Sequence, residues 1–585
     1  MPKLLQHFSV LMCLLLWAQS SYASANNNPK LHKLLDDIWQ YELTQYPSLA
    51  RSEGKDASEL TQQFSSISQS ALKARHEKFE SFMTQLDQIN TSALNDEDSI
   101  SLFMQKYRLN DYLSEYTYQA YMVPITSEYG FHSSIGTQLS GTTLKSKQDV
   151  QAYKQALSEL PALFAQYTTY MREAIAKNYT QPKVVLQGYE ATISAFVNNK
   201  IEEHPFYLPV IKANSDVLSK NEKETLYMLV EGANKAFSDF YAFFTNEYRP
   251  NAKDDIAAKN WPNGEALYNN RIKHYTTTNM SAKEIHELGL QEVARIRAQM
   301  QTIVDELEFD GDINAFIEFL RTDERFYAKT PKDLIMYASY VAKQMDAKLP
   351  KLFYTLPRTP YGVDPVPDSI APKYTTGRYI SSNSSDEPGY YWVNTYALDK
   401  RPLYAIPALT LHEAVPGHHL QISLAAEMQN LPKVRRNTYI SAFGEGWGLY
   451  SEYLGLEVGI YDDPYDDFGR LSYEMWRACR LVVDTGMHMF DWSRDKALAY
   501  MMENTALSEH NVRTEIDRYI SWPAQALSYK IGEIKIKALR KQAETALGDK
   551  FDLRAFHDAV LENGSIPLFV LEQRIETFIE NSLIE

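Results

Sequence analysis

The sequence is poor in cysteine and has no surplus of basic charge. Two of its 585 residues are cysteines, Cys13 and Cys479, and Cys13 falls in an apolar run near the N-terminus. A chain processed after that run keeps Cys479 alone, which excludes an intramolecular disulfide. Lysine and arginine number 59 against 75 aspartates and glutamates, so the formal net charge is −16. Because nucleic-acid binding needs a basic face to neutralise phosphates, we expect no nucleic-acid partner.

Long apolar runs are also missing beyond the N-terminus. No later stretch approaches the about 18 apolar residues that indicate a membrane span, so none is expected. At the N-terminus, Lys3, the apolar run 10–17 and the small-x-small site 23–25 have the order of a secretory signal peptide. We predict that residues 1–25 are removed and that the mature protein is periplasmic or secreted. Cys13 lies inside the apolar run and not after it, which argues against a lipid anchor.

The signatures of several enzyme classes are absent. The sequence has no Walker loop, no G-x-S-x-G nucleophile motif and no paired-cysteine zinc motif. Cys479 is the one thiol left for nucleophilic catalysis, and it lies in an apolar helical stretch where core packing is the better expectation. Other side chains must therefore carry any chemistry.

The hydrophobic pattern that is present is helical almost throughout. Residues 281–284 (Ser-x-x-Glu) predict a capping box, and residues 330–331 (Thr-Pro) predict an N-cap followed by proline in the first turn. Five prolines between 357 and 372 interrupt the pattern and favour an extended segment. Residues 390–395 then have the aromatic and β-branched composition of a short strand.

We predict a mainly α protein, a large helical body in two halves around a deep cleft, with a small β-sheet near residues 374–396. The proline-rich break divides a helical N-terminal half, residues 26–356, from a catalytic helical half, residues 357–585. The metal site is expected in the second half.

The segment Leu409–Gln421 (LTLHEAVPGHHLQ) gathers the residues of a metal-dependent hydrolase. Neutral imidazoles are good zinc ligands, and a glutamate beside the first of them, here Glu413 beside His412, is the usual general base. In the common H-E-x-x-H helix the two histidines are one turn apart. Here the second is His418 or His419. A regular helix rises about 1.5 Å per residue and would separate the pair by about 10 Å, too far for one ion.

Pro416 offers a way to shorten that separation. Proline cannot donate a hydrogen bond to the carbonyl four residues back, that of His412, and its ring clashes with this carbonyl, so we expect the helix to widen or bulge. Two looped-out residues would bring His418 to the position of an i+4 ligand, and three would bring His419 there. We favour His418 because it needs the smaller distortion, and we expect one Zn²⁺ ion.

An acidic third ligand is expected on a nearby helix. The segment 441–452 (SAFGEGWGLYSE) offers Glu445 and Glu452. We favour Glu445 because Gly444 and Gly446 allow a neighbouring backbone to approach closely. Glu452, two turns later, is interpreted as a solvated helix residue.

The C-terminal half contains four strings that resemble one known family. They are HEAVPGHH at 412–419, GEGWGLYSE at 444–452, DTGMH at 484–488 and PAQALSYKIG at 523–532. Together they are similar to the bacterial domain-of-unknown-function 885 family, and HELGLQEVARI at 286–296 extends the resemblance into the N-terminal half.

That family is regarded as peptidase-like and resembles the all-helical zinc peptidases of the angiotensin-converting-enzyme and thimet-oligopeptidase type. The resemblance implies that His412 is the first zinc ligand, Glu413 the general base and Glu445 the glutamate ligand. It also implies a histidine and a tyrosine downstream of the metal motif, matched here by His488 and Tyr529, that donate to the oxyanion formed when water attacks an amide.

Arg518 is a further candidate site residue. A guanidinium can hold a substrate carboxylate through two parallel hydrogen bonds. Its sequence neighbours Asp517 and Glu515 are alternative partners that would leave it a structural role.

These residues predict a secreted zinc peptidase that hydrolyses short peptides with metal-activated water and Glu413 as general base. Two alternatives remain open: a zinc hydrolase of another small amide or ester, and a periplasmic binding protein that has the same fold without catalysis. The position of Glu413 beside a ligand set favours catalysis over binding.

Overall fold

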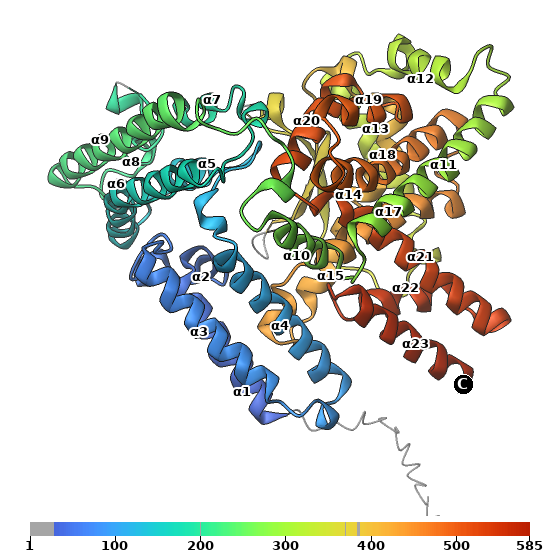
Figure 1. Cartoon of the computed structure of the whole chain (residues 1–585), viewed down its shortest axis with the longest axis horizontal. Coiled ribbons are helices and arrows are strands. Elements are labelled where there is room, and N and C mark those ends of the chain that lie inside the picture. Colours follow the sequence, from blue (N-terminus) through green and yellow to red (C-terminus); the bar gives the residue numbers. More distant parts are fainter. Residues whose placement is uncertain (1–27, 199, 369, 383–386, 585) are drawn as a thin grey trace, which may run out of the picture.

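The computed structural model describes residues 28–198, 200–368, 370–382 and 387–584, and it is built mainly of helices (Figure 1). The predicted signal peptide and Cys13 lie outside these residues. Within the described part of the chain, no helix is both long and apolar enough to cross a membrane.

The first nine helices lie in two groups at the left of Figure 1. The lower group, in blue, contains α1 (Pro29–Gln45), α2 (Pro47–Ser52), α3 (Gln69–Asp87) and α4 (Asp96–Thr117). The upper group contains α5 (Phe131–Ser140), α6 (Lys147–Ala176), α7 (Glu190–Ser194), α8 (Leu208–Lys212) and α9 (Lys220–Phe243). Helix α3 packs along α4, and α6 packs along α9.

The remaining helices form the larger body at the right of Figure 1. Before the sheet come α10 (Gly264–Thr276), α11 (Ala282–Glu306), α12 (Ile313–Thr322) and α13 (Pro331–Asp346). After it come α14 (Ile406–Glu413), α15 (His418–Glu427), α16 (Lys433–Arg436), α17 (Ser441–Val458), α18 (Pro464–Met489), α19 (Arg494–Asn504), α20 (Glu509–Ser521), α21 (Ser528–Leu547), α22 (Leu553–Leu561) and α23 (Leu568–Ile584).

Two predicted helix starts are confirmed. The Ser281 side chain accepts a hydrogen bond from the Glu284 backbone N–H, and the Glu284 carboxylate accepts one in return from the Ser281 backbone. Thr330 caps α13 in the same reciprocal way with Asp333, and proline occupies the first turn. Such boxes satisfy backbone donors that a helix start leaves free.

A small sheet interrupts the helices, as the composition predicted. It has the order β1 (Tyr361–Pro365), β3 (Gly389–Val393), β2 (Gly377–Ile380), with β1 parallel and β2 antiparallel to the central strand. Strands β2 and β3 fall in the predicted range, whereas β1 lies inside the proline-rich segment. Pro365 is tolerated there because β1 is an edge strand in the described part of the chain.

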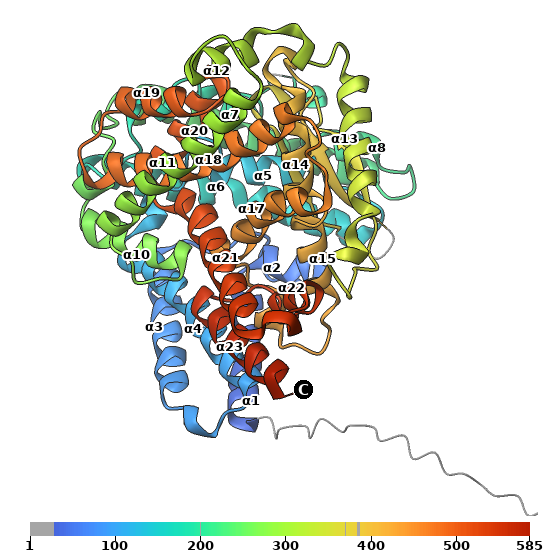
Figure 2. The same cartoon turned by 90° about the vertical axis from the view of Figure 1, so that its right-hand side faces the viewer.

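The buried core joins segments that are far apart in the sequence. Helix α11 packs along α18, and α17 packs along α21, the most extensive helix contacts in the molecule. Figure 2 shows α21 in front of α17, and α11 close to α18. Both large hydrophobic clusters contain residues from either side of position 357. The proposed division into two halves around a cleft stays a prediction.

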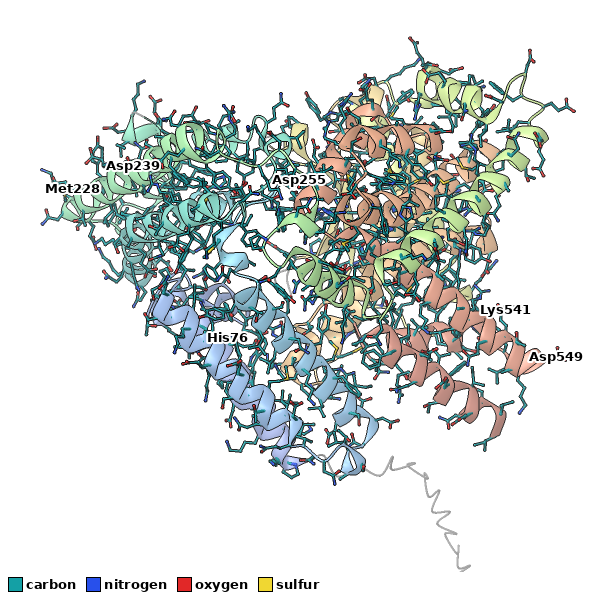
Figure 3. The ribbon with its side chains drawn as sticks, viewed as in Figure 1. His76, Met228, Asp239, Asp255, Lys541 and Asp549 are labelled. Atoms are coloured by element: carbon teal, nitrogen blue, oxygen red, sulfur yellow. The ribbon has the colours of Figure 1, made fainter. Side chains whose placement is uncertain are left out.

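Exposed side chains project from both ends of the molecule. Figure 3 shows Met228 and Asp239 on α9 at one end, and Lys541 on α21 with Asp549 just after this helix at the other. The metal-ligand candidates lie in neither of these regions but on α14, α15 and α17.

Candidate metal centre

The chain breaks its helix between the two histidines instead of bulging it. Helix α14 ends at Glu413, residues 414–417 form a turn that includes a cis Val415–Pro416 peptide, and α15 begins at His418. The prediction of one widened or bulged helix is therefore wrong. Pro416 still has the expected local effect, because it has no N–H to donate to the His412 carbonyl four residues back. Trp447 of α17 fixes the link by donating from its indole N–H to the Pro416 carbonyl, at 2.8 Å.

This break brings three potential ligand atoms together. Within the described residues, His412, His418 and Glu445 form a group in which one donor atom of each lies within 4.8 Å of the others. The Glu445 Oε2 atom is 3.5 Å from His412 Nε2 and 3.2 Å from His418 Nε2. All three side chains are largely buried, with 3%, 11% and 14% of their surfaces exposed.

The spacing fits a tetrahedral ion. Two ligands that each lie about 2.1 Å from one zinc ion are about 3.4 Å apart, close to the two carboxylate–imidazole distances given above. Two histidines and one glutamate also form a known protein ligand set for catalytic zinc, with the fourth position open. The donor set and its spacing therefore suit zinc.

A second carboxylate orients His412. Glu452 Oε1 accepts from His412 Nδ1 at 2.8 Å and also pairs with Arg477 Nη2 at 3.2 Å. This bond fixes the imidazole so that Nε2 is the nitrogen that faces Glu445 and His418. The interpretation of Glu452 as a solvated residue is wrong, because the structure buries it at 1% exposure. Its i, i+7 relation to Glu445 was the available signal, since two full helical turns place both on one face.

Glycine on α17 makes room for this arrangement. A Cβ at Gly448, between the two glutamates, would lie 2.8 Å from His412 Nε2 and 3.0 Å from Nδ1. The imidazole therefore lies directly against the helix backbone and reaches both carboxylates. Gly446 faces Gly532 of α21 in the same close manner, and this crossing brings Tyr529, one turn before Gly532, alongside His412.

Electrostatics in the cluster are dominated by its carboxylates. Burial alone would lower the pKa of His412, but the neighbouring carboxylates of Glu445 and Glu452 raise it to about 9. Burial would raise the pKa of Glu445, whereas His418 and His412 hold it well below its usual value. The metal-free cluster is therefore an ion-paired network, and a metal ion would replace protons on the imidazoles.

Glu413 lies beside this cluster but outside the group of ligand atoms. Its Oε2 atom accepts from the Tyr379 backbone N–H at 2.8 Å, so that strand β2 holds the carboxylate. Its charge helps to raise the pKa of His412. Arg378, the preceding residue on β2, is exposed, donates to the Tyr129 hydroxyl at 2.8 Å and is close enough for Glu413 to raise its pKa.

Two tyrosines flank the ligands. The Tyr529 ring lies nearly parallel to the His412 ring, with centroids 6.4 Å apart, and burial followed by the charge of Glu445 raises the pKa of its hydroxyl. The sequence does not single out Tyr439, which is 47% exposed as a whole residue but packs its hydroxyl where a Gly444 side chain would stand. Burial of this hydroxyl end, and then the charge of Glu445, raise the pKa of Tyr439 well above its usual value.

His419 points away from the ligand group. Its Nδ1 atom is 3.1 Å from the Tyr379 hydroxyl and 3.3 Å from Ser423 Oγ, and its ring packs on Tyr361. Burial lowers its pKa to about 4. His419 therefore supports strand β2 through the Tyr379 side chain, and the backbone N–H of the same tyrosine holds Glu413.

His488 is also outside the cluster. Its Nδ1 accepts from the Ala258 backbone N–H at 3.1 Å, and its Nε2 donates to the Tyr519 carbonyl at 2.9 Å. The residue is fully buried, and burial lowers its pKa to about 4. With both nitrogens bonded to backbone, it ties α18 to two neighbouring segments and has no free nitrogen for a substrate.

Arg518 pairs with Glu515, one of the two neighbouring carboxylates that the sequence suggested as alternative partners. It donates to Glu515 Oε2 from Nε at 3.3 Å and from Nη2 at 3.0 Å, and to Gln525 from Nη1 at 2.7 Å. Asp517 pairs instead with Arg494. Arg518 nonetheless remains close enough to Tyr529 for their charges to interact.

Comparison with known proteins identifies relatives of the same architecture. Residues 47–575 match the family model described as "Bacterial protein of unknown function (DUF885)". A crystal structure titled "putative lipoprotein" from Colwellia psychrerythraea is 28% identical, with a TM-score of 0.83 over 94% of this chain and 99% of that one. A structure from Shewanella oneidensis, titled a "putative lipoprotein of unknown function", is 18% identical with a TM-score of 0.73 over 93% and 98%, which shows a shared fold. A search of curated proteins found no significant match.

Proposed function

The chain belongs to the bacterial DUF885 family, and from the geometry of its buried histidine–glutamate cluster we propose that it is a zinc-dependent peptidase. The observation that carries the proposal is the convergence of His412 Nε2, His418 Nε2 and one Glu445 oxygen, with Glu452 fixing the far nitrogen of His412. Three ligands and an outer carboxylate are what a catalytic zinc site requires.

A purely structural network explains this cluster less well. Buried ion pairs are stabilised by close, fully hydrogen-bonded geometry, yet Glu445 Oε2 lies 3.5 Å from His412, longer than a good hydrogen bond. The same distance is ordinary for two ligands of one ion.

Zinc held at these three residues would polarise a substrate carbonyl and acidify water. In this proposal Glu413 would take the proton of the attacking water and return it to the leaving amine. The Tyr379 N–H holds one of its carboxylate oxygens at 2.8 Å, which fixes the side chain and leaves the other oxygen for proton transfer. The hydroxyls of Tyr529 and Tyr439, both close enough to Glu445 for its charge to raise their pKa values, would be donors to the developing oxyanion.

Strand β2 supports the proposed general base. Among the described residues it pairs with β3 alone, and at its other edge the Tyr379 N–H is bound by Glu413. The donor set suits the hydrolysis of a peptide, and another small amide or an ester is the alternative that the experiment below distinguishes.

We place the enzyme in the cell envelope. The 28% identical relative is titled a putative lipoprotein, and the N-terminal sequence has the order of a secretory leader. The proposal for this chain is a periplasmic or secreted peptidase that acts on short peptides.

The experiment is zinc analysis and peptide digestion of the same purified protein. A mixed library of short peptides is incubated with the zinc-loaded protein, with and without chelator, and products are identified by mass spectrometry. We expect one zinc per chain and cleavage that chelator abolishes. A protein that binds zinc but cleaves only ester or non-peptide amide probes would contradict peptidase activity, and one that binds no zinc would contradict the whole proposal.

A further inference from the structure

Two arginines converge on one carboxylate beside the proposed metal site. Arg480 of α18 and Arg518 of α20 both donate to Glu515 Oε2, at 3.1 Å and 3.0 Å through their Nη2 atoms. The Tyr519 hydroxyl donates to the same oxygen at 2.7 Å and accepts from Arg480 Nε at 2.7 Å. Both guanidinium groups are buried, with 3% and 10% of their side chains exposed. The cluster is therefore a built structure and not a surface pairing.

The hydrogen bonds of this cluster leave one donor over. Arg480 Nη1 is buried and has no hydrogen-bond partner among the described residues. By contrast, Arg480 donates through Nε and Nη2, and Arg518 through Nε, Nη1 and Nη2, to oxygen atoms of neighbouring side chains. A buried guanidinium N–H without a partner is unfavourable, and a ligand that accepts its hydrogen bond is one way in which a protein compensates this cost.

Charge in the cluster points the same way. Two guanidinium groups share the single carboxylate of Glu515, whose pKa they hold at about 2. Glu128 and Asp484 are further carboxyl groups whose charge interacts with both arginines, but burial raises the pKa of each, and the described residues record no hydrogen bond from either to the two guanidinium groups. Glu515 is thus the one carboxylate recorded as hydrogen-bonded to both guanidinium groups in the described part of the chain, and an anion would balance the second positive charge.

The cluster lies next to the proposed catalytic groups. The Arg480 guanidinium carbon is 4.2 Å from the centre of the Tyr529 ring and 4.4 Å from that of Trp476, and the Tyr529 ring lies nearly parallel to the His412 ring at a centroid distance of 6.4 Å. The charges of Arg480 and Arg518 both act on the Tyr529 hydroxyl and partly offset the rise in its pKa that burial and Glu445 cause. Tyr529 therefore contacts Arg480 and lies alongside the metal-ligand candidate His412.

We propose that Arg480 forms a subsite for a substrate carboxylate, with Nη1 as the free donor, and that Glu515 and the Arg518 bound to it position the Arg480 guanidinium. The inference rests on the proposed peptidase function and names its substrate class: peptides that carry a carboxylate close to the cleaved bond. The C-terminal carboxylate is the source common to all peptides, and an acidic side chain at a neighbouring position is the other. In the first case the enzyme removes residues from the C-terminus.

A matched peptide series distinguishes these sources in the wild-type protein. Each cleaved library peptide is made as a free acid, as a C-terminal amide, and as an amide with glutamine or glutamate next to the cleaved bond. A kcat/KM at least 10-fold higher for the acid than for the amide supports the C-terminal source. An equal gain from glutamate over glutamine supports the side-chain source. Equal cleavage of all forms overturns the subsite but leaves the peptidase standing, whereas no cleavage of any form refutes the peptidase itself.

Substitutions then assign the subsite to its residue. Arg480→Met keeps the aliphatic contacts with neighbouring rings and removes the charge, and it should lower kcat/KM for the preferred carboxylate peptide at least 10-fold while the amide changes less than 3-fold. Arg494→Gln, which breaks the ion pair with Asp517 on the same helix as Arg518, is the matched control and should change neither. An equal loss for acid and amide in Arg480→Met would show that Arg480 only supports the fold.

Binding provides a readout that does not depend on turnover. Calorimetric titration of zinc-loaded Glu413→Gln protein with the acid and amide forms should show tighter binding of the acid, with the difference lost in Arg480→Met, Glu413→Gln. Equal affinity for both forms in the parent protein would overturn the proposal.

Discussion

Two buried histidines at the ends of neighbouring helices, His412 on α14 and His488 on α18, differ in what their nitrogens meet. His412 faces Glu452 with one nitrogen and Glu445 with the other, and these carboxylates raise its pKa to about 9. His488 bonds to a backbone N–H and a backbone carbonyl, and burial lowers its pKa to about 4. Both histidines are buried, so burial alone does not decide the role of a histidine. The hydrogen-bond partners of its two nitrogens decide it, because of these two residues only His412 has a nitrogen that faces other potential metal ligands.

The largest expected difference is between the neighbouring histidines His418 and His419, of which only His418 is predicted to bind zinc. His418→Ala should abolish stoichiometric zinc binding, a larger effect than the about 10–100-fold loss of affinity caused by removing an outer-shell partner. His419→Ala, one residue away and also buried, should retain zinc because its ring lies against Tyr361 and Tyr379. Zinc content of the two dialysed variants is the measurement. Retention by His418→Ala, or loss by His419→Ala alone, would reverse the assignment.

Glu413 separates metal binding from chemistry within the His412 region. Glu413→Gln keeps the shape and can still accept the Tyr379 N–H through its amide oxygen, but it cannot take a proton from water. Turnover should fall by about 10²-fold or more, the usual size of general acid–base effects, while zinc content is unchanged. Rate and zinc are measured on one preparation. Normal turnover with full zinc would remove Glu413 from the mechanism, and loss of zinc would make it a ligand.

Glu452 tests whether a carboxylate partner is what distinguishes His412 from His488. Glu452→Gln preserves an oxygen for Arg477 but weakens the acceptor at His412 Nδ1. Zinc affinity should fall about 10–100-fold, as for other outer-shell partners of metal-bound histidine. Competition with a fluorescent chelator measures it, and Glu457→Gln on the exposed side of the same helix is the control. An unchanged affinity would show that Glu452 serves only to neutralise Arg477.

His488 should behave as a structural residue. His488→Ala leaves the Ala258 N–H and the Tyr519 carbonyl without partners, at about 1–3 kcal/mol for each buried group. The free energy of unfolding should fall accordingly, and zinc affinity should not change. Chemical denaturation and zinc titration of the same variant check both statements. Loss of zinc binding without loss of stability would place His488 in the site.

The pH dependence of stability gives a second test of the structural role of His488. Folding lowers the pKa of His488 to about 4 from an unfolded value near 6.5. Between these values the unfolded chain binds the extra proton, so stability is complete above pH 6.5 and declines as pH falls toward 4, by up to about 3 kcal/mol for this group. His488→Ala should show a shallower decline over this range than the wild type. An identical slope would mean that His488 is already neutral or charged in both states.

Local sequence signals predicted the helical elements well. The capping residues Ser281 and Thr330 act within one turn, so their patterns needed no knowledge of tertiary structure. The aromatic segment at 390–395 likewise appears as β3. Strand β1 was missed because its pairing with β3 is a long-range contact inside a segment whose prolines dominate the local signal.

The site was less accessible to sequence reasoning, because its geometry depends on how separate helices cross. The spacing of the histidines alone could not show whether the chain at Pro416 forms a bulge in one helix or, as observed, a turn between two helices. The i, i+7 spacing places Glu452 on the same helix face as Glu445, but its partners His412 and Arg477 come from two other helices, which the local pattern does not encode. The same holds for His488, whose backbone partners come from segments 230 and 31 residues away.

Zinc coordination by His412, His418 and Glu445 is best tested by locating zinc in crystals of the zinc-loaded protein through anomalous scattering at the zinc edge. We expect one peak per chain, about 2.0–2.2 Å from His412 Nε2, His418 Nε2 and a Glu445 oxygen, with Glu413 outside the ligand shell. No peak at saturating zinc, or a peak that does not contact these three residues, would contradict it.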